Sequence, residues 1–131
     1  MSYTIYDHVN QKGVNTFREW TEGLQRPDRV KLAVKLDALA MTGSDLAPGL
    51  FADSNSKHIK KLRIIGRGSV QLRPMLCKGP IDNNSEFTLL LGAIEKGSRL
   101  EPKNADALAE RLRQQVAANP NKRRCKHEPV T

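Results

Sequence analysis

The sequence predicts an α+β fold in which two N-terminal helices are followed by a small antiparallel β-sheet and a C-terminal helix. Apolar residues recur at helical spacing in the first third of the chain, alternate with polar residues through most of 60–94, and return to helical spacing after Pro102. The length of 131 residues suits one domain with one hydrophobic core. We therefore expect residues 1–120 to form a single domain.

The two N-terminal helices are expected near residues 14–24 and 27–41. Asn15 can cap the first helix, and Pro27 fits the first turn of the second, where a missing N–H costs nothing. Gly43 follows the last apolar residue of the second pattern and favours a helix end there. Residues before the first helix are expected to form either a short strand or an ordered arm.

The sheet is expected to contain a hairpin and one well-buried strand. The hairpin strands are 61–65 and 70–76, joined by a glycine-containing turn at 66–68. Pro74 has no N–H, so its strand should have an edge or a bulge there. The uninterrupted apolar run Phe87–Ile94 predicts the most buried strand. Together with the C-terminal helix, these patterns predict one core that contains Leu62, Ile64, Val70, Leu72, Leu89, Leu91, Leu108 and Leu112.

The C-terminal helix is expected to begin after Pro102 and to end at Asn119 and Pro120. Its apolar side chains recur at i, i+3, i+4, i+7 and i+11 from Ala105. Residues 121–131 are basic and almost without apolar side chains, so we expect them to be a flexible tail.

The net charge limits the classes of partner. Lys and Arg number 22 against 14 acidic residues, a formal charge of +8, which favours nucleic acid over an acidic membrane surface or an acidic protein. No apolar run approaches the roughly 18 residues of a membrane span, and the N-terminus does not resemble a signal peptide. The two cysteines have neither metal-ligand nor disulfide-framework spacing. We expect a cytoplasmic protein with no metal, no cofactor and no membrane contact.

Cations are concentrated in the segments that are expected to form the hairpin. A small sheet that displays so many positive charges suggests a surface for a polyanion. Few aromatic residues lie on these strands, so base stacking is poorly provided for. The cations of this basic ribbon are Lys57, Lys60, Lys61, Arg63, Arg67, Arg73 and Lys78.

Five short phrases in a particular order resemble a known family. They are Phe17, Trp20 and Leu24; Asp28-Arg29-Val30-Lys31; Lys60-Lys61-Leu62; Gln71-Leu72-Arg73; and Leu89 to Pro102. In their wording and order the chain resembles the RelE/HigB superfamily of bacterial toxins, and in particular its phage-derived HigB-like branch. The resemblance implies a metal-independent endoribonuclease of a type II toxin–antitoxin pair. Such an enzyme cuts mRNA through attack of a 2′-OH, often on the ribosome, and its partner is an antitoxin protein, typically with a helix-turn-helix.

The resemblance also implies roles for particular residues. Arg73 would stabilise the transition-state phosphate, and Lys96 keeps a family position near the expected cleft. The RNA backbone would be held by Lys57, Lys60, Lys61, Arg63, Arg67, Lys78 and Arg99.

A second hypothesis comes from three departures from the family pattern. Leu91, Ala93 and Glu95 stand where the family has His, Phe and Lys. They favour a catalytically silent relative, encoded by a phage or prophage, that binds nucleic acid or protein.

Overall fold

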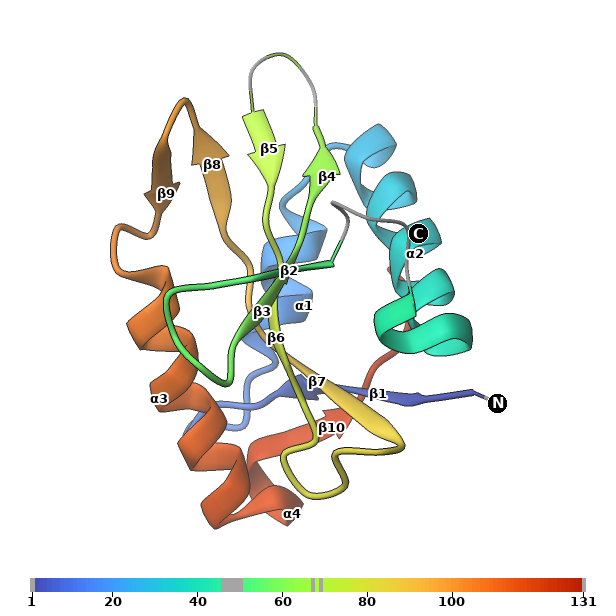
Figure 1. The fold of residues 1–131 in the computed structure, drawn as a ribbon, viewed down its shortest axis with the longest axis vertical. Coiled ribbons are helices and arrows are strands. Elements are labelled where there is room, and N and C mark those ends of the chain that lie inside the picture. Colours follow the sequence, from blue (N-terminus) through green and yellow to red (C-terminus); the bar gives the residue numbers. More distant parts are fainter. Residues whose placement is uncertain (1, 46–50, 67, 69, 131) are drawn as a thin grey trace.

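The computed structural model describes residues 2–45, 51–66, 68 and 70–130, which form a mixed α/β fold (Figure 1). The described residues contain four α-helices and ten β-strands, and the strands form a six-stranded and a four-stranded sheet. The expected fold class, two N-terminal helices with a small antiparallel sheet and a C-terminal helix, is therefore wrong. The strands form two sheets instead of one small antiparallel sheet, and several strands of two or three residues are too short to give a readable alternation. The short strand Thr4–His8 is one of the two alternatives expected before the first helix.

The six-stranded sheet has the order β10-β1-β7-β6-β3-β2. Strand β1 is parallel to β7, in a register that runs from Thr4 opposite Glu86 to Asp7 opposite Leu89. The other pairs in this sheet are antiparallel. Its strands are β1 (Thr4–His8), β2 (Phe51–Asp53), β3 (Lys60–Leu62), β6 (Met75–Lys78), β7 (Glu86–Leu91) and β10 (Arg124–Lys126).

The four-stranded sheet has the order β4-β5-β8-β9. Its strands are β4 (Ile64–Ile65), β5 (Val70–Leu72), β8 (Ile94–Lys96) and β9 (Arg99–Glu101). Three of its strands adjoin strands of the six-stranded sheet in the sequence: β4 follows β3, β5 precedes β6, and β8 follows β7. The expected hairpin is thus divided between two sheets. The division falls at Arg63 on one strand and at Arg73 and Pro74 on the other, where the Leu62 N–H donates to the Pro74 carbonyl (3.0 Å).

The helices lie largely where periodicity predicts them. They are α1 (Thr16–Glu22), α2 (Arg26–Thr42), α3 (Ala105–Ala118) and α4 (Pro120–Arg123), with a 3-10 turn η1 (Gly43–Asp45). The Asn15 side chain caps α1 by accepting from the Arg18 N–H (2.9 Å), and Pro27 lies in the first turn of α2. The two expected N-terminal helices and the end of α3 near Asn119 are confirmed.

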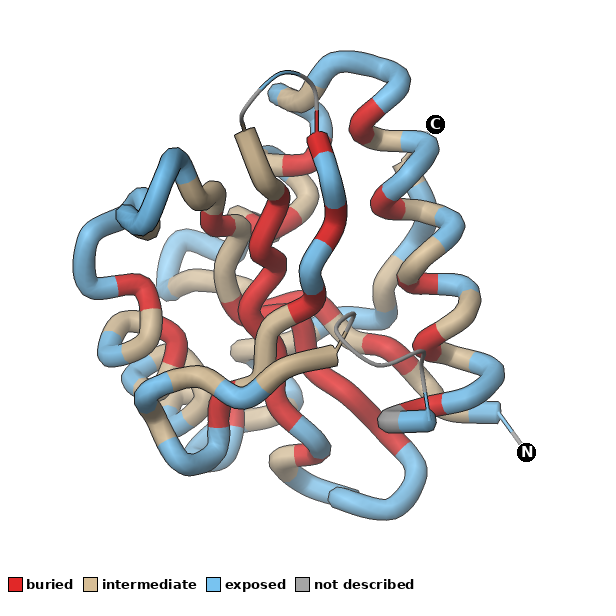
Figure 2. The backbone as a smooth tube through the Cα atoms, turned by 45° about the horizontal axis from the view of Figure 1, so that its top comes forward, coloured by how far each residue is buried: buried red, intermediate tan, exposed pale blue. Residues whose placement is uncertain are grey.

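Buried residues run along the central strands and recur along the helices (Figure 2). Their side chains form two clusters, where the sequence led us to expect one core. Alternation along β7 separates them, because Phe87 and Leu89 enter the first cluster and Leu90 the second. The first cluster contains Ile5, Phe17, Leu32, Leu36, Leu39, Leu62, Ile64, Leu72, Leu76, Phe87 and Leu89. The second contains Ile59, Met75, Cys77, Leu90, Ala93, Ala105, Ala109 and Val116.

Four residues that were expected in the single core are only partly buried. Leu91 and Leu112 are partly buried against the second cluster, and Val70 and Leu108 are half-buried. The first cluster packs α1 and α2 against one face of the six-stranded sheet, and the second packs α3 against the other. Figure 1 shows α2 and α3 on opposite sides of the strands.

The C-terminal residues, expected to form a flexible tail, form α4 and the edge strand β10. Tyr6 of β1 pairs with Lys126, and the guanidinium of Arg124 lies 3.8 Å from the Tyr6 ring centroid. Arg124 also forms an ion pair with Glu86. The segment is held by backbone pairing and polar contacts. Because it contains almost no apolar residues, hydrophobic patterns in the sequence do not predict it.

Candidate functional site

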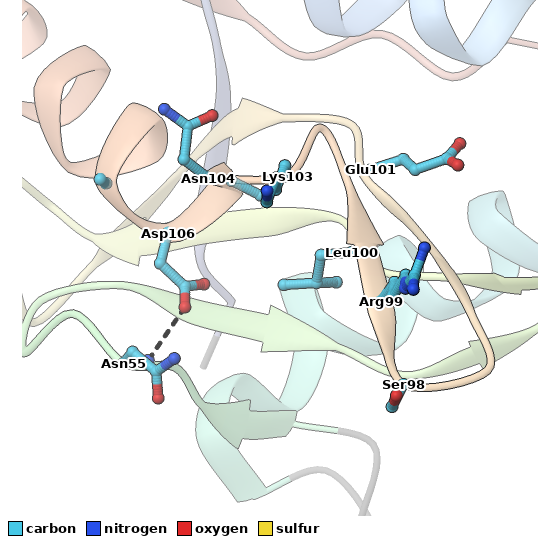
Figure 3. Close-up of a pocket in the computed structure, with 10 residues that line it drawn as sticks. Asn55, Ser98, Arg99, Leu100, Glu101, Lys103, Asn104 and Asp106 are labelled. Atoms are coloured by element: carbon cyan, nitrogen blue, oxygen red, sulfur yellow. Dashed lines mark hydrogen bonds between the residues drawn. The ribbon is translucent and has the colours of Figure 1, made fainter.

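A wide pocket lies between the β8–β9 hairpin and the start of α3 (Figure 3). Its volume is about 810 Å³, and we call it the hairpin pocket. Arg99 and Lys103 line it together with Glu101 and Asp106, so its charges balance. Asp106 points toward Asn55, whose N–H donates to its Oδ2 (3.3 Å). The hairpin pocket therefore has no electrostatic preference for an anion.

A smaller pocket of about 260 Å³ lies at the end of β3 and β6, and we call it the basic pocket. The last β3–β6 pair joins Lys60 to Leu76, whereas β6 continues to Lys78. The chain before Lys60 therefore leaves the sheet while β6 continues, and a hollow forms between them. The basic pocket is lined by Lys57, His58, Lys60, Lys78, Pro80, Asn83 and Arg113.

Buried neighbours hold the walls of the basic pocket in place. Ile59 is fully buried in the second cluster and fixes the segment that carries the first three lining residues. The Thr88 hydroxyl donates to the Gly79 carbonyl and ties down the start of the β6–β7 loop. Arg113 comes from α3, which is packed on the sheet through Ala105, Ala109 and Val116. Three separate parts of the chain thus converge on one hollow.

Cations outnumber carboxylates around the basic pocket. Lys60 forms an ion pair with Asp53, and this hydrogen bond and the lysine charge lower the pKa of Asp53. The Nε and Nη2 atoms of Arg113 bond to Glu110 at 2.8 to 3.0 Å. Lys57 and Lys78 are exposed and have no carboxylate partner in the described part of the chain. Four cations thus face two carboxylates, which leaves a surplus of two positive charges.

Arg73 lies at the junction of the two sheets and is only 7% exposed. Its Nη1 donates to the Leu72 carbonyl (3.0 Å), and its Nη2 lies 3.4 Å from Glu95 Oε2. Its backbone N–H donates to the Ala93 carbonyl (2.8 Å). Because neighbouring side chains of a strand point to opposite faces, Lys96 points away from the face on which Glu95 meets Arg73. The two residues expected to act together in catalysis are therefore not brought together.

The remaining residues of the expected RNA-binding set are spread over the molecule. Lys57, Lys60 and Lys78 meet in the basic pocket, and Arg99 lines the hairpin pocket. Lys61 lies on β3, opposite Met75, and Arg63 is exposed between β3 and β4. Arg67 lies outside the described residues.

Sequence reasoning missed Arg113 and Asn83 as members of the site. Arg113 follows Leu112 on the polar flank of α3, and nothing local distinguishes it from the other charged residues of that helix. Only the packing of α3 on the sheet brings it to the lysines.

Metal binding and thiol chemistry find little support in the described residues. No three His, Cys, Asp or Glu side chains among them come together as a metal site. Burial raises the pKa of the Cys77 thiol to about 12, so this side chain stays protonated and is a poor nucleophile.

Comparisons with protein-family models, curated proteins and solved structures found no match to this chain. In the described part of the chain, no helix has the length and apolar character needed to cross a membrane.

Proposed function

We propose that this protein binds RNA through its phosphate backbone, with the basic pocket as the main point of contact, and that it does not cut the RNA. One observation carries the proposal: a single hollow with surplus positive charge is lined by cations from three separate parts of the chain, namely Lys57 and Lys60, Lys78, and Arg113. Lysine and arginine that neutralise phosphates supply most of the affinity of sequence-independent RNA binding.

The catalytically silent form of the hypothesis is favoured by the position of Arg73. Its guanidinium is buried and bonded to Leu72 and Glu95, so it would have to leave both partners to reach a scissile phosphate. The toxin-like endoribonuclease, with its antitoxin partner, is the competing hypothesis, and the same experiment distinguishes the two.

The test measures binding of a fluorescently labelled single-stranded RNA by anisotropy at several salt concentrations. Each phosphate contact contributes a slope of about −0.7 in log K against log salt. The variant Lys57→Ala/Lys78→Ala should bind more weakly and lose about 1.4 from this slope, because two contacts are removed. The matched control, Lys12→Ala/Lys126→Ala, removes the same charge from exposed sites outside the pocket and should keep most of the affinity.

Two outcomes would count against the proposal. Equal losses in both double variants would show that overall charge, and not the pocket, binds the RNA. Cleavage of the RNA on a denaturing gel by the parent protein would establish the endoribonuclease hypothesis instead, most directly if Arg73→Ala abolished the cleavage.

A further inference from the structure

We propose that the basic pocket binds a terminal phosphate of the RNA, a phosphomonoester at the strand end, in preference to a phosphodiester within the strand. This inference rests on the proposed function and specifies which part of the RNA enters the pocket. Three properties of the pocket support it: its size, its charge and the absence of Phe, Tyr and Trp among its lining residues.

The size of the pocket suits a small polar group. Its volume of about 260 Å³ lies below the range of about 300–1,000 Å³ that is usual for sites of drug-sized molecules. A strand end can insert a phosphate into such a hollow from one side. An internal phosphodiester carries a nucleoside on each side and needs an open groove that lets the strand enter and leave.

The charge of the pocket matches a dianion. A phosphomonoester carries about −1.5 to −2 at pH 7, whereas a phosphodiester carries a single negative charge. The surplus of two positive charges comes from Lys57 and Lys78, which have no carboxylate partner among the described residues, while Asp53 and Glu110 offset Lys60 and Arg113. A terminal phosphate would neutralise both free lysines, and an internal one would leave one lysine charge unbalanced.

The lining residues offer several hydrogen-bond donors and no Phe, Tyr or Trp ring on which a base could stack. Lys57, Lys78 and the Asn83 amide can donate to phosphate oxygens. Arg113 also has Nη1 without a protein acceptor in the described part of the chain, since its bonds to Glu110 use Nε and Nη2. None of the lining residues is Phe, Tyr or Trp, the rings on which proteins stack single-stranded bases. The pocket is therefore better provided with donors for phosphate oxygens than with rings for base stacking.

The experiment compares three versions of one short RNA that carry an internal fluorophore: a 5′-phosphate, a 3′-phosphate, or hydroxyl groups at both ends. We expect one phosphorylated version to bind about tenfold tighter than the hydroxyl version, because charged hydrogen bonds are gained. The preference should disappear in Lys57→Ala/Lys78→Ala and persist in Lys12→Ala/Lys126→Ala. Circular dichroism and thermal unfolding confirm that both double variants are folded, and both replace exposed side chains.

The possible outcomes distinguish failure of this inference from failure of the proposed RNA binding. If all three RNAs bind equally well and all lose affinity in Lys57→Ala/Lys78→Ala, the pocket takes internal phosphodiesters; the inference fails and the proposed function stands. If none of the three binds, the proposed function fails as well. A preference for a phosphorylated end that survives in Lys57→Ala/Lys78→Ala would place the end-binding site elsewhere and would overturn the inference.

Discussion

The two faces of the six-stranded sheet are packed by side chains of different size. The face covered by α1 and α2 is filled by leucines and aromatic rings, such as Leu39 and Phe87. The face covered by α3 relies on small side chains, Ala93, Ala105 and Ala109 among them. Alanines fill little space, so α3 packs closely on the sheet and brings Arg113 to the lysines at the sheet's end. The first face thus buries more of the large side chains, whereas the second also positions the candidate site.

The largest expected effect is a loss of stability from a substitution that disrupts packing on the first face alone. Leu39→Ala should lower the free energy of unfolding by about 2–5 kcal/mol, because Leu39 is fully buried among large side chains and the substitution leaves a cavity. Denaturant unfolding measures the loss, with Met41→Ala, at an exposed position of the same helix, as a near-neutral control. RNA affinity below the unfolding range should stay at the parent value. A loss of affinity in folded Leu39→Ala protein would show that the two faces are coupled.

The next effect concerns the polar contact that ties the C-terminus to the first face. Asp7 is buried and accepts from Asn15 Nδ2 (2.8 Å), and its Oδ1 lies 2.8 Å from His127 Nδ1. His127→Ala should cost about 1.5–3 kcal/mol of stability, because a hydrogen bond to a buried carboxylate is lost. His127→Asn, which keeps a donor, should cost less, and Lys126→Ala, at an exposed neighbouring position, very little. Thermal and denaturant unfolding give the order of the three. A neutral His127→Ala would mean that the contact between His127 and Asp7 adds nothing measurable to stability.

A third prediction tests the close packing of the second face. Ala109→Leu inserts a larger side chain where no space exists and should cost about 1–3 kcal/mol. It should also weaken RNA binding, because α3 must move outward and carry Arg113 away from Lys57 and Lys78. Ala107→Leu, at an exposed position of α3, is the control for both measurements. Unchanged RNA affinity in the destabilised variant would show that α3 does not set the geometry of the pocket.

Sequence patterns predicted the elements with long periodic signals and failed where the signal is short. The helices α1, α2 and α3 and the buried strand β7 follow from apolar spacing, and the position of Pro74 indicated the break between β5 and β6. The polar strand β10 and the three-residue strand β2 carry no such pattern. In α2, apolar character alone does not predict burial, because Val30 and Val34 are 51% and 57% exposed.

The candidate site could be predicted only in part. The lysines of the basic pocket were visible as a ribbon of charge, because they are close together in sequence. Arg113 was not, because it joins them through tertiary packing. Arg73 was chosen from a resemblance to a family motif. Its surroundings at the junction of the two sheets decide whether its guanidinium is available, and these surroundings include Ala93 and Glu95.

The smallest expected effect is a pH dependence that arises from His8 on the second face. His8 is buried, its Nε2 lies 3.1 Å from Gln115 Oε1, and its Nδ1 has no partner among the described residues. Burial lowers the pKa of His8 below the ordinary 6.5, the bond to Gln115 opposes this in part, and the charge of Arg123 adds to the lowering. A proton on Nδ1 would be a buried donor without an acceptor.

The sign of the effect follows from proton binding in the two states. Below pH 6.5 the unfolded chain binds a proton at His8 that the folded protein resists, so stability falls as the pH decreases from 6.5 toward the folded-state pKa. The decrease contributed by this group is at most about 1.4 kcal/mol per pH unit. His8→Gln removes the titration, so the difference in unfolding free energy between parent and variant should shrink or change sign between pH 7.5 and pH 5. If the difference in unfolding free energy between parent and variant stays constant over this range, His8 titrates alike in the folded and unfolded states. The second face would then have no pH dependence that arises from His8.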